Sequence, residues 1–188
     1  MAPSFVITDL PGKKAIKMAT TDVNETNDDI TVRSPEWMIK IENLLSSNLA
    51  GYEDYAELFG WNEESSRFTP GNLSNQLLGS ATLKHSGLMI LIPNGGHSAH
   101  IELKMNRGIP LRTIQIVRLG NIQNTKVKLQ ALDYTDCWIQ SFQQQLDRII
   151  VSVSVSTKKN TVYIYDNDGG NKGQIVSEVN YVQGNVDG

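Results

Sequence analysis

Two histidines lie close together in the segment GGHSAHIEL, where imidazole nitrogens could bind a transition metal. His97 and His100 are three positions apart. His100 lies within residues 98–106, which we interpret as a strand, and His97 lies in the turn before it. Residues three apart on a strand point to opposite faces of the sheet. The spacing therefore favours an ordinary loop and strand edge, and we predict no metal ligand here.

The acidic segment DNDGGN, residues 166–171, is a second candidate for metal chemistry. Alternating oxygen-bearing side chains of this kind begin a calcium-binding loop, which also needs a bidentate carboxylate at its twelfth position. That position is Ser177, with Glu178 one residue later. The alternative is a tight turn after a strand, because Asn, Asp and Gly tolerate positive φ angles. We expect the turn and assign no cofactor.

The sequence carries no motif of a known catalytic centre. The segment GGNKG at residues 169–173 lacks the Gly-Lys-Ser/Thr ending of a phosphate-binding loop, and no serine lies in a nucleophile elbow. Cys137 has aromatic neighbours, Tyr134 and Trp138, and no histidine nearby in sequence, which favours a buried structural thiol. We therefore predict no catalytic residue and a protein that is not an enzyme, although distant residues can assemble an active site.

Composition is that of a globular protein. The chain has 188 residues, of which 39% are hydrophobic, and a formal net charge of −3. This balance offers no basic surface to nucleic acid or to an acidic membrane, and the single cysteine excludes an internal disulfide framework. The N-terminal residues MAPSFVITDLPGKK lack the basic start and apolar stretch of a secretory signal. We expect one intracellular domain that binds neither nucleic acid nor membrane.

The strongest helix signal comes early in the chain. Ser34, Pro35 and Glu36 have the character of an N-cap, a first-turn proline and a first-turn acid, and apolar residues follow at helical spacing to residue 48. Residues 52–59 are a possible second, short helix. Residues 62–79 contain Pro70–Gly71 and indicate a long exposed connection.

From residue 80 onward the hydrophobic period changes to two. Residues 149–156 give the clearest case, in which Ile149, Val151, Val153 and Val155 alternate with serines and Ile150 is the one apolar exception. We predict strands at residues 80–92, 98–106, 111–119, 125–133, 136–143, 147–157 and 160–166, and a possible edge strand at 174–181. Strands at this spacing, with little helix between them, predict a mainly β fold: an antiparallel β-barrel or sandwich with one N-terminal helix.

The expected solvent faces of these strands carry short or uncharged polar side chains. Ser152, Ser154 and Ser156 share one side of their strand, opposite the apolar residues. Such a surface is hydrated and binds passing chains weakly, which suits the wall of a channel. A plain solvated sheet face explains the same pattern.

The run from Val127 to Asp166 resembles the C-terminal half of haemolysin-coregulated proteins, the tube subunits of type VI secretion, and related tail-tube proteins of contractile phages. Residues 132–139 match the family's strand before a polar turn, residues 149–155 its long alternating strand, and residues 162–165 (VYIY) its final strand ending in an aromatic residue. Arg112 to Ile116 match the preceding outer strand, and the resemblance extends over residues 98–182.

The resemblance implies a structural subunit that forms hexameric rings, which stack into the inner tube of a contractile injection machine and carry effectors in the lumen. A single tube-type domain would then comprise N-terminal strands and a loop (1–33), a helical insertion and extended loop (34–79), barrel strands (80–166) and a polar C-terminal arm (167–188). The implied partners are the chain itself, a sheath, a baseplate or spike, and effectors. The protein would be made in the bacterial cytoplasm and exported without a signal peptide.

Two sets of residues are assigned on this basis. The residues expected to face the lumen are Lys126, Lys128, Gln130, Ser152, Ser154 and Ser156. The residues expected at contacts between subunits are Arg67, Phe68, Pro70, Asp166, Asp168 and Tyr181. The alternative function is an adaptor or ligand-binding β-sandwich of a secretion or phage apparatus, for which Trp61, Trp138 and Tyr163 are the available aromatic anchors.

Overall fold

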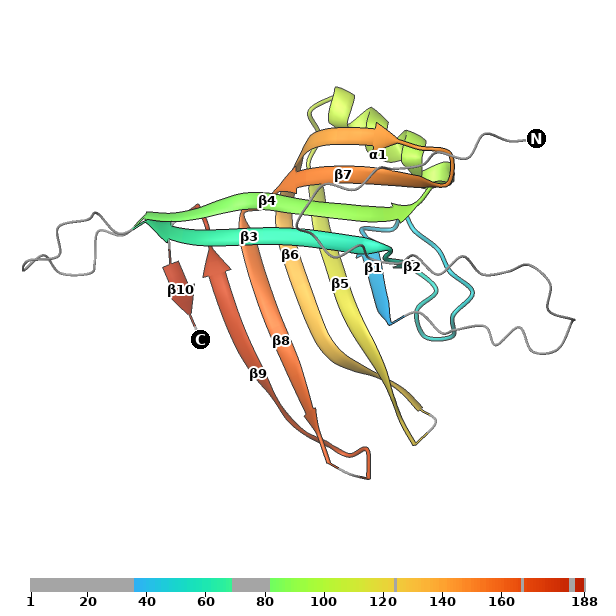
Figure 1. Cartoon of the computed structure of the whole chain (residues 1–188), viewed down its shortest axis with the longest axis vertical. Helices are drawn as coiled ribbons and strands as arrows, with labels where there is room; N and C mark the ends of the chain where they lie inside the picture. Colours follow the sequence, from blue (N-terminus) through green and yellow to red (C-terminus); the bar gives the residue numbers. More distant parts are fainter. Residues whose placement is uncertain (1–35, 69–81, 124, 167, 183–184, 188) are drawn as a thin grey trace, which may run out of the picture. The chain divides into compact units, whose positions relative to one another are not determined.

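The computed structural model describes residues 36–68, 82–123, 125–166, 168–182 and 185–187. These residues form antiparallel β-sheets with one short helix, so the predicted fold class is confirmed (Figure 1). The elements, in chain order, are β1 (Trp37–Ile41), β2 (Ala56–Glu57), β3 (Gly60–Phe68), β4 (Thr82–Pro93), α1 (Gly96–Asn106), β5 (Leu111–Ile122), β6 (Thr125–Gln144), β7 (Arg148–Ser154), β8 (Thr157–Tyr165), β9 (Asn171–Asn180) and β10 (Asn185–Asp187).

Strand β6 belongs to two sheets. Its residues Gln130–Thr135 pair with β8 in a first sheet of order β10-β9-β8-β6-β5-β1-β2. Its residues Trp138–Gln144 pair with β7, which continues through β4 to β3 and forms the second sheet. Asp136 lies between the two paired regions and has a positive φ of 49°. The hydrogen-bonded path through the described strands does not close into a barrel.

The main hydrophobic core fills the space between the two sheets. The alternation predicted for β7 is confirmed, because Ile149, Val151 and Val153 are fully buried in this core. A smaller cluster lies on the opposite face of the first sheet, where Tyr52 and Tyr55 cover Val117. The first sheet is therefore buried on both faces near β1 and β5.

The helices predicted at residues 34–48 and 52–59 are wrong. Residues 37–41 form β1, and the chain then passes through turns to the two-residue strand β2. Met38 is buried in the smaller cluster whereas Ile39 and Ile41 are buried in the main core, so β1 has buried apolar residues on both faces. A short run that is apolar on both faces has no period of two, and it resembles a buried helix segment.

Three further boundaries differ from the prediction. Residues 60–68 form β3 rather than the start of an exposed connection, and residues 96–106 form α1 rather than a strand. The two strands predicted at 125–133 and 136–143 are one continuous strand, β6. The predicted edge strand at 174–181 corresponds to β9, and β10 pairs outside it. The predictions for residues 1–33 lie outside the described residues. No helix in the described ranges is long and apolar enough to cross a membrane.

Candidate functional site

One face of the first sheet carries rows of polar side chains that run across the strands. Thr113, Thr135 and Thr157 occupy paired positions on β5, β6 and β8. The next row contains charges that alternate in sign and sum to zero: Lys40, Gln115, Asp133, Lys159 and Glu178. Since neighbouring positions on β1, β5 and β6 point into the main core, these rows point away from it. The result is a hydrated, mixed-charge surface.

A cavity of about 290 Å³ opens on this polar face. The Tyr55 hydroxyl donates a hydrogen bond to the side-chain oxygen of Gln115, whose amide nitrogen donates to Asp133. Burial, with the nearby charge of Asp133, raises the pKa of Tyr55, so the phenol stays protonated at neutral pH. Lys40 pairs with Asp54 at 2.9 Å. These polar side chains of the cavity are thus paired by hydrogen bonds or ion pairs, and none of those described is an activated nucleophile.

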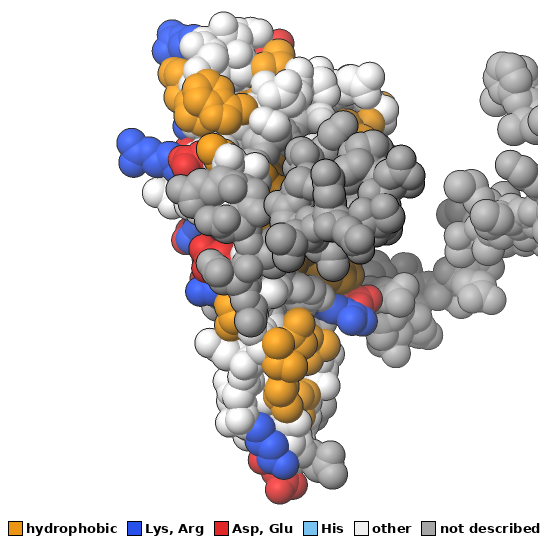
Figure 2. Space-filling view, turned by 90° about the vertical axis from the view of Figure 1, so that its left-hand side faces the viewer, with side chains coloured by type: hydrophobic (Ala, Val, Ile, Leu, Met, Phe, Trp, Pro, Cys, Tyr) orange, Lys and Arg blue, Asp and Glu red, His pale blue; other side chains and the backbone are white. Residues whose placement is uncertain are grey.

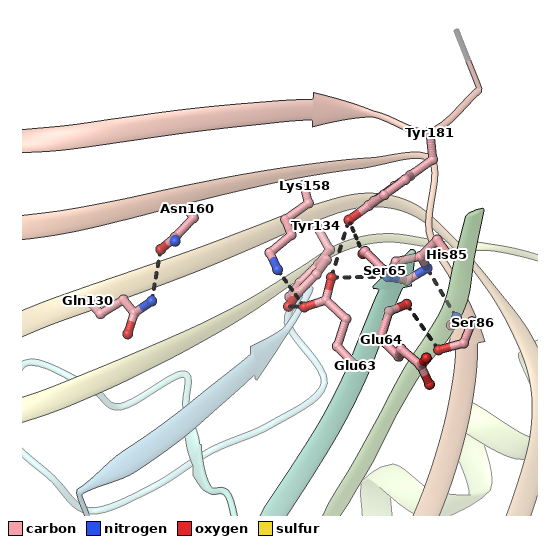
Figure 3. Close-up of polar contacts among 11 residues, drawn as sticks. Glu63, Glu64, Ser65, His85, Ser86, Gln130, Tyr134, Lys158, Asn160 and Tyr181 are labelled. Carbon is pink, nitrogen blue, oxygen red and sulfur yellow. Dashed lines mark hydrogen bonds and ion pairs between the residues drawn. The ribbon is translucent and has the colours of Figure 1, made fainter. Parts of the chain in front are cut away.

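The residues predicted to line a lumen fall on three different surfaces. Lys126 and Lys128 lie on the polar face of the first sheet, where the Lys128 ammonium is 5.8 Å from the centre of the Tyr52 ring. A bulge interrupts the pairing, since Leu119 pairs with Lys128 whereas Arg118 pairs with Gln130. Gln130 therefore points to the opposite face, where it donates to Asn160 at 2.9 Å (Figure 3).

The predicted serines belong to the second sheet. Ser152 and Ser154 alternate with buried valines and point outward, and Ser152 pairs with the half-exposed Met89. Ser156 follows β7 and its hydroxyl donates to the backbone oxygen of Asp136 at 3.4 Å. The structure thus brings Lys126 and Lys128 together, and Ser152 and Ser154 together, but does not join the two pairs on one face.

The residues predicted at subunit contacts are also dispersed. Arg67 and Phe68 end β3, and Pro70 lies outside the described residues. Asp166 and Asp168 belong to the turn between β8 and β9. Tyr181, directly after β9, contacts a buried charge cluster of its own chain.

This charge cluster is centred on Glu63 of β3, whose side chain is 4% exposed (Figure 3). One carboxylate oxygen, Oε2, accepts hydrogen bonds from Lys158 Nζ at 2.6 Å and from the Tyr134 hydroxyl at 2.8 Å. The other, Oε1, lies 3.0 Å from His85 Nε2 and accepts from the Tyr181 hydroxyl at 3.3 Å. The cluster therefore connects the second sheet to β6, β8 and the end of β9.

The backbone fixes the tautomer of His85. The Gly87 amide donates to His85 Nδ1 at 3.1 Å, so Nδ1 carries no proton and Nε2 donates to Glu63. Gly87 has a φ of 99°, and a Cβ there would meet the Val153 carbonyl oxygen at 3.0 Å. The Tyr181 ring packs against the imidazole at a tilt of 36°, with ring centroids 4.3 Å apart. The cluster is thus a carboxylate–ammonium pair surrounded by neutral donors.

The electrostatics agree with this assignment. Burial raises the pKa of Glu63, but hydrogen bonds from Lys158 and Tyr134 together with the Lys158 charge outweigh it, and the pKa falls below its usual value. Burial, followed by the Glu63 charge, raises the pKa of Tyr134 far above its usual value. These groups are held in single protonation states at neutral pH, which suits a structural tie between the sheets. The sequence gives no sign of the cluster, because Glu63 and Lys158 are 95 positions apart.

The structure shows where the residues considered for metal binding and catalysis lie. His97 and His100 lie on α1 and not on a strand as predicted, and His97 Nε2 is 2.8 Å from the Pro93 carbonyl oxygen. Asp166 and residues 168–170 belong to the tight turn expected, since the Asp166 amide donates to the Gly170 carbonyl at 2.9 Å. Cys137 is buried as predicted, and burial raises the pKa of its thiol to about 12.

The aromatic anchors considered for an adaptor do not gather. Trp61 packs against the main core beside Trp37, and Tyr163 packs against the smaller cluster. Trp138 is 48% exposed on the second sheet.

Comparison with known proteins relates this fold to solved structures. No family model and no curated protein matches the sequence. A solved structure described as a type six secretion system protein superposes with a TM-score of 0.69 at 12% identity, over 82% of this chain and 100% of that one. Hcp1 from Salmonella typhimurium superposes with a TM-score of 0.61 at 14% identity, over 80% of this chain and 97% of that one. Hcp1 from the E. coli EAEC 042 pathovar gives a TM-score of 0.61 at 10% identity, over 79% and 99%. The chain therefore has the fold of these type VI secretion Hcp proteins.

Proposed function

We propose that this protein is a structural subunit whose copies form hexameric rings that stack into the inner tube of a contractile injection machine. The observation that carries the proposal is the extent of the fold similarity: the superposition covers 97% of Hcp1 from Salmonella typhimurium and 99% of Hcp1 from E. coli. The similarity thus includes nearly all of each solved chain.

The polar face of the first sheet is the surface best suited to the bore of such a tube. Its threonine row is neutral, and its neighbouring row balances positive with negative charge. A surface of this kind stays hydrated and has no large field that would hold a passing protein. Lys126 and Lys128 belong to this face, whereas Gln130, Ser152, Ser154 and Ser156 lie elsewhere. We place the bore accordingly, on the side of Lys126 and Lys128.

Strand edges that no other described strand covers support assembly. Strand β3 pairs with β4 on one side, and β10 pairs with β9 on one side. The unpaired backbone groups of an edge strand invite another chain, and a closed ring of copies covers them. The turn at Asp166 and Asp168 and the end of β3 at Arg67 and Phe68 remain proposed contacts between subunits.

The proposal assigns no catalytic activity and no cofactor to this chain. Its partners would be further copies, a sheath, a baseplate or spike, and effectors carried in the bore. Export would take place through the assembled machine.

The test is direct observation of the assembly. Electron microscopy of the purified full chain should show annular particles, and sedimentation velocity should give one species at six times the chain mass. A chain that stays monomeric at millimolar concentration, with no annuli, would refute the proposal. Association with a single foreign partner but never with itself would favour the adaptor function instead.

A further inference from the structure

The turn between β6 and β7 presents an apolar side chain to solvent. Leu146 is 97% exposed, the highest value among the large hydrophobic side chains that the structure describes. Turn positions favour Gly, Pro, Asn, Asp and Ser for reasons of backbone geometry, and leucine has none of these advantages. Burying a leucine side chain is favourable by about 1.5–3 kcal/mol, so a contact that covers Leu146 would gain free energy of this size.

This turn is held in place by hydrogen bonds. The Gln145 amide donates to the Arg148 carbonyl at 2.8 Å and closes the turn. Asn94, at the start of the segment before α1, donates from its amide to the Asp147 carbonyl at 2.9 Å and from its side chain to the Gln145 carbonyl at 3.1 Å. Leu146 is therefore an ordered apolar knob, and little conformational entropy is lost when it is bound.

A matching apolar surface lies on β8 and β9. Val162 and Ile175 are directly paired across the two strands, and Ile164 follows Val162 on the same face; their exposed fractions are 39%, 63% and 42%. These three residues are called the aliphatic seat. The uncharged amide pair of Gln130 and Asn160 borders it. Figure 2 shows hydrophobic side chains gathered near the lower end of the molecule, where β8 and β9 approach their turn.

The knob and the seat lie towards opposite ends of β6. The seat lies beside Gln130, which pairs with Val162. Leu146 comes two residues after Gln144, the last residue of β6. Fourteen residues separate these positions, or about 45 Å along an extended strand. Figure 1 shows the β8–β9 turn at the lower end of the first sheet and β7 at the upper end. Leu146 therefore cannot reach the seat of its own chain.

We propose that Leu146 of one copy packs into the aliphatic seat of a second copy, and that this contact joins successive rings. A knob and a seat at opposite ends of one chain make a head-to-tail contact, which extends as a stack when it is repeated. The seat is small and uncharged, so each contact is weak, but several act together when two rings meet. The inference rests on the proposed ring function and adds the residues that stack the rings.

Cysteine cross-linking tests the contact. The double variant Leu146→Cys/Ile175→Cys, mildly oxidised at high protein concentration, should give a ladder of covalent multimers longer than dimers. The native Cys137 is buried and does not interfere. The matched control Leu146→Cys/Leu103→Cys uses an exposed leucine of α1 in place of the seat, and should give no ladder. Equal ladders from both variants, or none from the first, would overturn the inference.

Charge substitution separates this inference from the proposed function. Leu146→Asp leaves the fold intact because the side chain is fully exposed, and rings should persist while the fraction of stacked rings falls about tenfold. Leu103→Asp should stack as the wild type does. Rings of Leu146→Asp that stack normally would overturn the inference and leave the ring function standing. A wild-type chain without rings would overturn both.

Discussion

Replacing Glu63 with glutamine should destabilise the protein far more than an ordinary polar substitution. The side chain is 4% exposed and accepts four hydrogen bonds, one of them from the Lys158 ammonium. Glutamine keeps the shape but removes the charge, and its amide NH₂ faces two donors in place of an acceptor oxygen. A hydrogen bond to a charged group contributes about 1.5–3 kcal/mol. Lys158 is 22% exposed and keeps some hydration, so we expect a loss of about 3 kcal/mol in unfolding free energy.

Urea denaturation at pH 7, at one fixed protein concentration, measures this loss. Glu64→Gln is the matched control, since Glu64 is the next residue on β3 and is exposed, and its effect should stay within about 0.5 kcal/mol. The double variant Glu63→Gln/Lys158→Met removes both charges and should be more stable than Glu63→Gln alone. A Glu63→Gln protein as stable as Glu64→Gln would refute the view that the cluster ties the sheets together.

Three other outcomes follow from the geometry. Because the pKa of Glu63 is lowered in the folded state, its stabilising effect is fully present above the unfolded value near pH 4.5 and is lost as the pH falls through the folded value. The difference in unfolding free energy between wild type and Glu63→Gln should therefore shrink below pH 4.5 in urea titrations. A constant difference down to about pH 2 would contradict this. The Cys137 thiol, with its pKa raised to about 12, should react with an aromatic disulfide reagent at pH 8 only after unfolding, so rapid labelling of the native chain would show the burial to be wrong. Gly87→Ala should cost about 2 kcal/mol in thermal or urea unfolding, because φ is positive and the new Cβ meets a carbonyl, and Gly51→Ala, with φ of 81° and open space, should cost about half as much.

Strands with one buried face could be predicted from the sequence. In β7 every second residue is buried, and the resulting period of two is visible without any tertiary information. In β1 residues on both faces are buried, so the sequence shows no hydrophobic period of two. The N-cap signal of Ser34–Pro35–Glu36 therefore favoured a helix in the prediction. The helix α1 was predicted as a strand because Ile101, Leu103 and Met105 alternate in the sequence like the buried face of a strand. Of these three residues only Ile101 is buried in the structure.

The candidate site depended on information that lies outside any local window. Lys126, Lys128 and Gln130 alternate in sequence, but a bulge at Leu129 moves Gln130 to the other face. A bulge forms where one strand has an extra residue relative to its partner, and the sequence of a single strand does not show this. The Glu63 cluster likewise requires five residues from four strands and the chain after β9. Leu146 lies in the gap between the strands predicted at residues 136–143 and 147–157, and its exposure is evident only with the turn in place.

The continuity of β6 has a mechanical consequence. Its 20 residues run without a break through both sheets, so a load applied at the β6–β7 turn passes to the β5–β6 hairpin through covalent backbone rather than through side-chain packing. Neither sheet can separate from the other without tearing hydrogen bonds from this shared strand. The two layers therefore yield together, as one cooperative unit, under pulling or compression along that direction.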